Sequence, residues 1–268
     1  MQSRRIFALL LTGVLAGCGG GGGGYGAPSQ SPPVVQPPVA SKSPGGIWHG
    51  FSTSNETLTL FVAETGTLRA LVTKGVPPNV QPPLFGSGAV LVTGDQLAGA
   101  YDSGQPFTTF AEHCELTGTL VERVSMNVTL DCTDSSGAKR SPAVTLGYDT
   151  DYGRASSLAA IAGNYTFSLR PTNVLSIDGN GVIFGTYDNG PNCTVNGTAE
   201  IVDSRYNLYA VKWLMSLCKV PFTQFEGATM SGFGVMNVRG APAGSVLVLL
   251  TGIVAGHLEG ASLMYQPP

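Results

Sequence analysis

Cysteine is the residue type in this chain with the clearest chemical options. A thiol can carry a lipid, pair in a disulfide or bind zinc, and an odd number of cysteines leaves one thiol outside any set of disulfides. Zinc sites usually need closely spaced ligands such as C-x2-C, and the cysteines here are far apart. We therefore expect two disulfides and one thiol with another role among the five: Cys18, Cys114, Cys132, Cys193 and Cys218.

Cys18 ends a segment that is built like a secretion signal. Arg4 and Arg5 precede a short apolar run over residues 6–14, and the box Leu15-Ala16-Gly17-Cys18 follows it. This box resembles the lipobox of bacterial lipoproteins, in which the cysteine receives a diacylglycerol and becomes the first residue after cleavage. The resemblance implies lipidation at Cys18 and an outer-membrane location. The alternative is an ordinary secretory signal with a chance cysteine.

Other side chains do not match a familiar catalytic or metal-binding pattern. The histidines, His49, His113 and His257, lack the spacing of metal ligands, and on a strand His113 would face away from its neighbour Cys114. Residues 149–153 begin like a calcium loop but lack the glycine and glutamate of its sixth and twelfth positions. We therefore expect no enzyme activity, no metal and no cofactor.

A group of aromatic residues in the second half of the chain offers a different kind of site. Aromatic side chains are enriched in binding hot spots, so these residues are candidates for a ligand pocket or a partner-binding patch. The alternative is that they point inward and fill a core. The group consists of Tyr206, Tyr209, Trp213, Phe222 and Phe225.

The elements that position these residues are short strands behind a tether. Residues 19–46 contain nine glycines and six prolines, which is typical of a flexible spacer. Ser156 or Ser157 is expected to cap a single helical turn that ends near Ile161. Alternating apolar and polar residues, bounded by turn residues, predict strands at 57–62, 88–92, 125–130, 174–177, 182–187, 207–217, 229–236, 245–251 and 258–265.

The two halves of the folded part resemble each other. Gly46-Ile47-Trp48 and Gly163-Asn164-Tyr165 each place a glycine two residues before an aromatic, and a hairpin follows at Gly66 or at 179–181. The pattern C-x-x-x-G-T begins at Cys114 and again at Cys193, and each time an alternating strand then ends on a cysteine. An internal duplication with a period of about 80–115 residues accounts for these matches. It pairs Cys114 with Cys132 and Cys193 with Cys218.

Each half has room for about eight strands, and closing eight antiparallel strands into a barrel removes exposed sheet edges. We predict an all-β fold of two tandem up-and-down barrels, with two β-sandwiches as the alternative. The pattern loosely resembles lipocalin-like and avidin-like (calycin) barrels and the two-barrel surface lipoproteins of Gram-negative bacteria, although no ligand-binding residue of those families can be matched here. The predicted parts are a signal peptide (1–17), a lipidated tether (18–45) and barrels at 46–160 and 161–268.

These features predict an outer-membrane lipoprotein that acts as a non-enzymatic binding or envelope-interaction module. The lipid on Cys18 holds it to the membrane, and we expect a protein partner in the envelope. The mature chain has 12 basic and 17 acidic residues and no basic cluster, which argues against nucleic acid. The first alternative is a carrier whose barrel holds a small apolar ligand, and the second is an enzyme of unrecognised type. Since each half exceeds 100 residues, we also expect the halves to fold separately.

Overall fold

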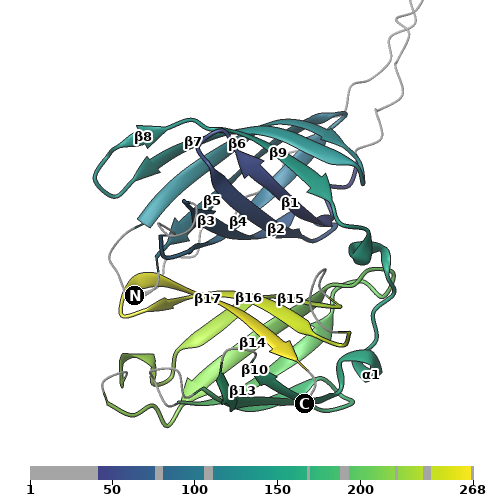
Figure 1. Ribbon diagram of the computed structural model, residues 1–268, viewed down its shortest axis with the longest axis vertical. Coiled ribbons are helices and arrows are strands. Elements are labelled where there is room, and N and C mark those ends of the chain that lie inside the picture. The colour runs from purple at the N-terminus through teal and green to yellow at the C-terminus, as the bar shows by residue number, and fades with distance from the viewer. Residues whose placement is uncertain are drawn as a thin grey trace, which may run out of the picture. The chain divides into compact units, whose positions relative to one another are not determined.

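The computed structural model describes residues 42–75, 81–105, 111–167, 170–187, 193–220, 223–237 and 243–266. The signal peptide, the lipobox and most of the tether lie outside these residues. The described chain is almost entirely β-structure, arranged as two closed antiparallel barrels (Figure 1). The fold class predicted from the residue alternation is confirmed. Within the described residues, no helix is long and apolar enough to cross a membrane.

Barrel 1 is an eight-stranded ring in which each strand pairs with the next along the chain. Its last strand pairs with β7 and with β1, which closes the ring, and a two-residue strand, β8 (Lys139–Arg140), pairs with the end of β7. The ring consists of β1 (Gly46–Ser52), β2 (Glu56–Val62), β3 (Thr67–Lys74), β4 (Leu84–Thr93), β5 (Gln96–Gly104), β6 (Ala111–Val121), β7 (Ser125–Asp134) and β9 (Ala143–Tyr148).

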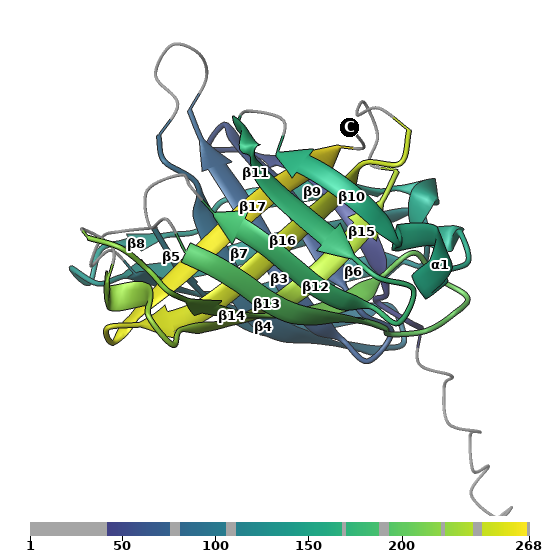
Figure 2. The ribbon, with the colours of Figure 1, turned by 90° about the horizontal axis from the view of Figure 1, so that it is seen from below.

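Barrel 2 repeats this plan, with its strands following one another around the ring (Figure 2). It closes where β10 meets β17, through the pairs Thr166–Gln266 and Phe167–Tyr265. The strands are β10 (Gly163–Phe167), β11 (Arg170–Ile177), β12 (Val182–Tyr187), β13 (Cys193–Ile201), β14 (Tyr209–Ser216), β15 (Thr229–Met236), β16 (Val246–Val254) and β17 (His257–Gln266).

A short connection joins the two barrels. It contains the 3-10 helix η1 (Thr150–Gly153) and the α-helix α1 (Leu158–Ile161), and a further 3-10 helix, η2 (Thr223–Phe225), follows β14. The hydroxyl of Ser157 accepts a hydrogen bond from the backbone N–H of Ala160 at 3.1 Å and caps α1. The predicted capped helical turn is therefore confirmed.

Strand alternation sends one set of side chains into each barrel, where apolar residues pack against one another. Trp48, Leu60 and Leu116 belong to the packed interior of barrel 1. Tyr165 and Trp213 belong to that of barrel 2. The described interiors are thus occupied by the protein's own side chains.

The first four strands of the two barrels correspond closely. The Trp48 Nε1–H donates to the carbonyl of Pro44, and the Tyr165 hydroxyl donates to that of Ile161, in each case four residues upstream. At the second hairpin, Gly66 and Gly181 have positive φ values, and a Cβ there would lie 2.1 and 2.2 Å from a carbonyl oxygen of the fourth strand. Only glycine fits such a position. This correspondence supports the duplication, at an offset of 117 residues for Trp48 and Tyr165 and of 115 residues for Gly66 and Gly181.

The cysteine motif does not follow the same correspondence between the barrels. The disulfides Cys114–Cys132 and Cys193–Cys218 are confirmed, each within one barrel. However, Cys114 lies on β6, the sixth strand of its barrel, whereas Cys193 lies on β13, the fourth. The two C-x-x-x-G-T segments are therefore not equivalent strands. Their glycines share a local requirement instead, because a Cβ on Gly118 or Gly197 would lie within 2.2 Å of a carbonyl oxygen on the neighbouring strand.

The barrels share a buried apolar interface on their outer faces. The sheet of barrel 1 contributes Ile47, Phe61 and Ala63, and these pack in one cluster with residues of barrel 2 such as Phe233 and Leu249. Residues Val39–Pro268 accordingly form one compact unit. Separate folding of the halves remains a prediction. A half that folds alone would expose its side of this apolar interface to water, which is unfavourable.

Candidate functional site

The aromatic residues proposed as a patch do not form one surface. Tyr209, Trp213 and Phe225 are buried inside barrel 2, which is the core-filling arrangement. Tyr206 lies elsewhere, stacked on Tyr152 with ring centroids 4.9 Å apart. Phe222 lies outside the described residues. Aromatic content along the sequence therefore did not distinguish inward-facing side chains from a binding surface.

The histidines and the acidic segment have ordinary structural partners. His113 is exposed, with Nδ1 2.7 Å from the Asp102 carboxylate, whereas Cys114 faces inward in its disulfide. His49 contacts Thr59 at 3.1 Å. The Asp149 carboxylate accepts from the Asp151 N–H and caps η1. The side chain of His257 lies outside the described residues.

A different candidate site is a cluster of charged side chains at one end of barrel 1. We call this end, where β1 ends and β2 begins, the mouth of barrel 1. Residues two positions apart on a strand point to the same side. Glu56 therefore points inward like Leu58, and Glu112 points inward like Cys114. The inward-facing polar side chains of the mouth are Ser52, Glu56, Lys74, Ser103, Glu112 and Arg140.

Arg140 is the centre of the charged network. Its guanidinium donates two hydrogen bonds to Glu112, from Nε at 2.6 Å and from Nη2 at 2.7 Å, and a third from Nη1 to Glu56 at 2.8 Å. The Lys74 ammonium lies 3.5 Å from Glu56 and 3.8 Å from Glu112. Burial alone would lower the pKa of Arg140, but the hydrogen bonds to Glu112 and the negative charges of Glu112 and Glu56 outweigh burial and raise it. All four groups therefore act as one ion network.

This network is unusual in its burial. Among the residues whose side-chain burial is described, Glu56 and Glu112 are the only charged residues that are almost fully buried, at 3% and 4% exposed. Barrel 2 adopts the same fold, and no charged residue is buried where the burial of its side chains is described. Buried ion pairs are weak contributors to stability, because desolvation offsets much of their attraction. A barrel of this kind does not need the network in order to close.

Tyr101 lies directly beneath the network. Its ring extends from β5 over Gly86, where a Cβ would lie 2.7 Å from the ring, and glycine at this position leaves the space that the ring fills. Burial raises the pKa of Tyr101, and the charges of Arg140, Glu112 and Glu56 also act on it. Its hydroxyl is buried and has no hydrogen-bond partner among the described residues.

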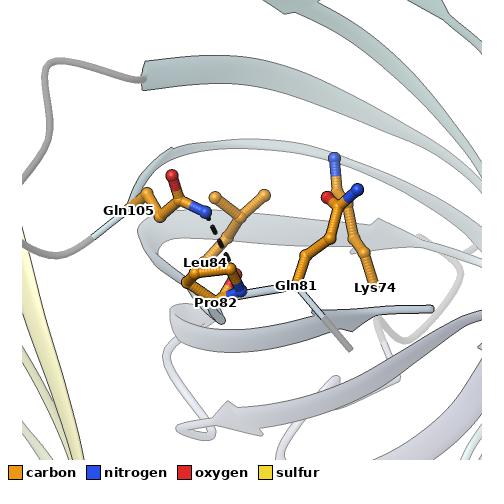
Figure 3. A pocket seen from close by; sticks show the side chains of 5 residues that line it. All are labelled: Lys74, Gln81, Pro82, Leu84 and Gln105. Atoms are coloured by element: carbon orange, nitrogen blue, oxygen red, sulfur yellow. Dashed lines mark hydrogen bonds between the residues drawn. The ribbon is translucent and has the colours of Figure 1, made fainter. Parts of the chain in front are cut away.

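A cavity of about 130 Å³ opens beside the network. Lys74 and Gln81 lie next to each other on one side, and Gln105, Pro82 and Leu84 lie on the other (Figure 3). The Gln105 amide donates to the carbonyl of Pro82 at 3.3 Å. Lys74 belongs both to the ion network and to the cavity wall, so the cavity and the buried charges form one polar site.

One group of potential metal ligands adjoins this site. Glu112, Cys114 and Cys132 place potential ligand atoms within 4.8 Å of one another. Both sulfurs are in a disulfide, however, and only a thiolate is a good ligand for a metal ion. The arrangement can instead bind polar groups by hydrogen bonds and charge.

Sequence reasoning missed the mouth of barrel 1, although a signal was present. Glu56, Lys74 and Glu112 each extend an alternating apolar series by one step, where a charge on the inward side is unexpected. Arg140 has no such signal, because it lies in a two-residue strand beyond a turn. Its role follows only from the closed ring.

Comparison with known proteins does not place the chain in a family. No family model matches the chain, and no curated protein is detectably similar to it in sequence.

Proposed function

We propose that this protein is a lipid-anchored, non-enzymatic binding module of the outer membrane that binds through the mouth of barrel 1. The observation that carries the binding role is the buried ion network, which opens into a polar cavity at one barrel and has no described counterpart in the other. The anchor rests on the lipobox-like sequence that ends at Cys18.

Two features favour this role over the alternatives. The described barrel interiors are packed with side chains, which speaks against a carrier that holds a small apolar ligand within a barrel. The Ser52 hydroxyl donates to Glu56, but the same hydroxyl accepts the backbone N–H groups of Ser54 and Glu56, and Arg140 holds the carboxylate in an ion pair. These bonds are those of a turn and an ion network, which favours a binding role over an enzyme.

The anchor predicts the fate of a Cys18→Ser variant. Serine has no thiol for the diacylglycerol, so the variant should lose lipidation and accumulate as precursor or leave the membrane. Metabolic labelling with a palmitate analogue measures this, with the natural chain as the control. Label that persists in the variant would refute the lipobox assignment.

Binding at the mouth predicts a position-dependent crosslink. A photo-reactive residue in place of Gln81, at the cavity wall, should capture a partner or ligand in the living host. The same residue in place of Lys212, which is exposed on β14 of barrel 2, should not. Mass spectrometry of the purified adducts gives the readout. Equal capture from both positions would show that the mouth is not the binding position.

A further inference from the structure

Acidic residues gather on the outer side of β5, β6 and β7, next to the mouth of barrel 1. Glu115 and Asp131 stand directly opposite each other in the pairing of β6 with β7, and both are exposed. Like charges in this position repel each other and destabilise a sheet. Asp102 is exposed on β5, one register step of two residues nearer the mouth, and Asp134 ends β7. We call these four residues the acidic patch.

Little positive charge compensates the acidic patch within the protein. The strands from β4 to β9 contain one lysine, Lys139, which is exposed, and one arginine, Arg140, which is held by Glu56 and Glu112. Other carboxylates of barrel 1 and the adjoining segments do have basic partners: Asp95 with Lys42, Glu64 with Arg123, and Asp151 with Arg154. The patch therefore keeps a negative charge that a basic partner would neutralise.

A groove of about 310 Å³ lies beside the acidic patch, at the rim of the mouth. Asp102 and Asp134 line it on the charged side, and Ala111 and Leu258 add apolar walls. Leu258 belongs to the β16–β17 hairpin, which approaches the end of β5 closely at Gly104. A Cβ there would lie 2.6 Å from the Leu258 carbonyl oxygen, so glycine permits the contact that forms this wall.

The groove is continuous with the mouth of barrel 1. Ser103 and Glu112 are inward-facing residues of the mouth, and both also line the groove. The Glu112 carboxylate is already held by Arg140, so the accessible charge of the groove comes from the acidic patch. A partner that binds at the mouth can therefore extend over the groove and the patch.

The spacing of the acidic patch suits several separate positive charges rather than one metal ion. Among the described residues, one set of three potential ligands lies within 4.8 Å of one another, and it contains no member of the patch. Successive outward residues of a strand are about 6–7 Å apart, because the strand rises about 3.3 Å per residue. An extended polypeptide repeats its own side chains at the same distance.

We propose that the acidic patch and its groove bind a basic segment of a protein partner. Lysine or arginine side chains of the segment contact Asp102, Glu115 and Asp131, and an apolar side chain enters the groove between Ala111 and Leu258. This inference rests on the proposed function, because it takes the partner of the mouth to extend into the adjoining groove.

Two short synthetic peptides test the charge requirement directly. One alternates lysine with valine, and the other has glutamate in place of lysine. The full mature chain with Cys18→Ser is titrated, and the amide resonances of His113, Glu115 and Thr133 are followed by NMR. We expect saturable shifts with the lysine peptide, weakened by added salt because exposed charges are screened, and no shifts with the glutamate peptide.

Two results of this titration would overturn the inference. The first is the absence of saturable shifts with the lysine peptide, or equal shifts with the glutamate peptide. The second is displacement of the lysine peptide by calcium chloride but not by sodium chloride of equal ionic strength, which would identify a cation site instead.

Matched variants assign the binding to the patch. Glu115→Gln combined with Asp131→Asn retains the shape of both side chains, so the Kd for the lysine peptide should rise at least tenfold. The Tm should not fall, because the repulsion between the two carboxylates is removed. Glu122→Gln combined with Glu200→Gln changes the net charge equally at exposed positions elsewhere and should leave the Kd nearly unchanged. An equal rise in both variants would overturn the inference.

The crosslinking experiment separates this inference from the proposed function. Host crosslinking from residue 81 without binding of the lysine peptide would reject the basic segment and retain the proposed function. Failure of both experiments would reject both.

Discussion

Arg140→Ala should lower the free energy of unfolding by about 3 kcal/mol, because it leaves the buried carboxylates of Glu56 and Glu112 with only Lys74 to compensate them. For a chain of this size, that loss corresponds to a fall in Tm of roughly 6–12 °C. Denaturant unfolding followed by tryptophan fluorescence measures it, since Trp48 lies inside barrel 1.

Arg154→Ala is the matched control. Arg154 also pairs with a carboxylate, Asp151 at 2.8 Å, but its side chain is 55% exposed. Exposed pairs contribute little, so this variant should stay within about 0.5 kcal/mol of the natural chain. Equal losses in the two variants would mean that the charges at the mouth are not buried in solution.

Removing all four charges should have a much smaller effect than removing one. The apolar-mouth variant combines Glu56→Leu, Lys74→Met, Glu112→Leu and Arg140→Met. Well-packed apolar replacements of buried ion networks are often neutral or stabilising, so we expect this variant to fold with a stability close to that of the natural chain. The contrast with Arg140→Ala separates the cost of an unpaired charge from the value of the network.

Phe61→Ala should destabilise the protein by about 3–5 kcal/mol although Phe61 points out of barrel 1. Its side chain is fully buried, at 0% exposed, in the cluster that the outer faces of the two barrels share. Truncation leaves a cavity at this interface. Differential scanning calorimetry gives the change and also shows whether the two barrels still unfold together.

Phe51→Ala provides the comparison on the same outer face. Phe51 lies on β1 and is 71% exposed, so its truncation should change stability by no more than about 0.5 kcal/mol. If Phe61→Ala is as mild as Phe51→Ala, the barrels do not pack through this cluster. The prediction of independent halves would then be the better description.

The sequence predicts the strands well because they leave local signals. The disulfide pairs were predicted correctly from the duplication, although the cysteine motif behind that argument does not mark equivalent strands. Val182–Tyr187 and Thr229–Met236 coincide with predicted strands, since alternation and turn residues bound them closely. Closure of each ring could be anticipated only from the number of strands. The partner strands of the closing pairs are far apart in the chain, as β1 and β9 show.

The buried interface between the barrels and the charge cluster at the mouth were harder to predict, because both join residues that are far apart in the chain. Phe61 and Phe51 look alike in sequence, each an apolar residue at an outward position, and only the contact with barrel 2 separates them. The network joins Glu56, Glu112 and Arg140, which are separated by many residues and meet only when the ring closes. The short cysteine motif misled the strand alignment, because close strand approach can require glycine on any strand.

The central claim is that the charges at the mouth of barrel 1 serve binding. The most direct test is the crosslinking yield from a photo-reactive residue at position 81, measured in the host for the natural chain and for the apolar-mouth variant at equal levels of folded protein. We predict that the variant loses the crosslink although it remains folded. An undiminished yield from the folded variant would contradict the claim.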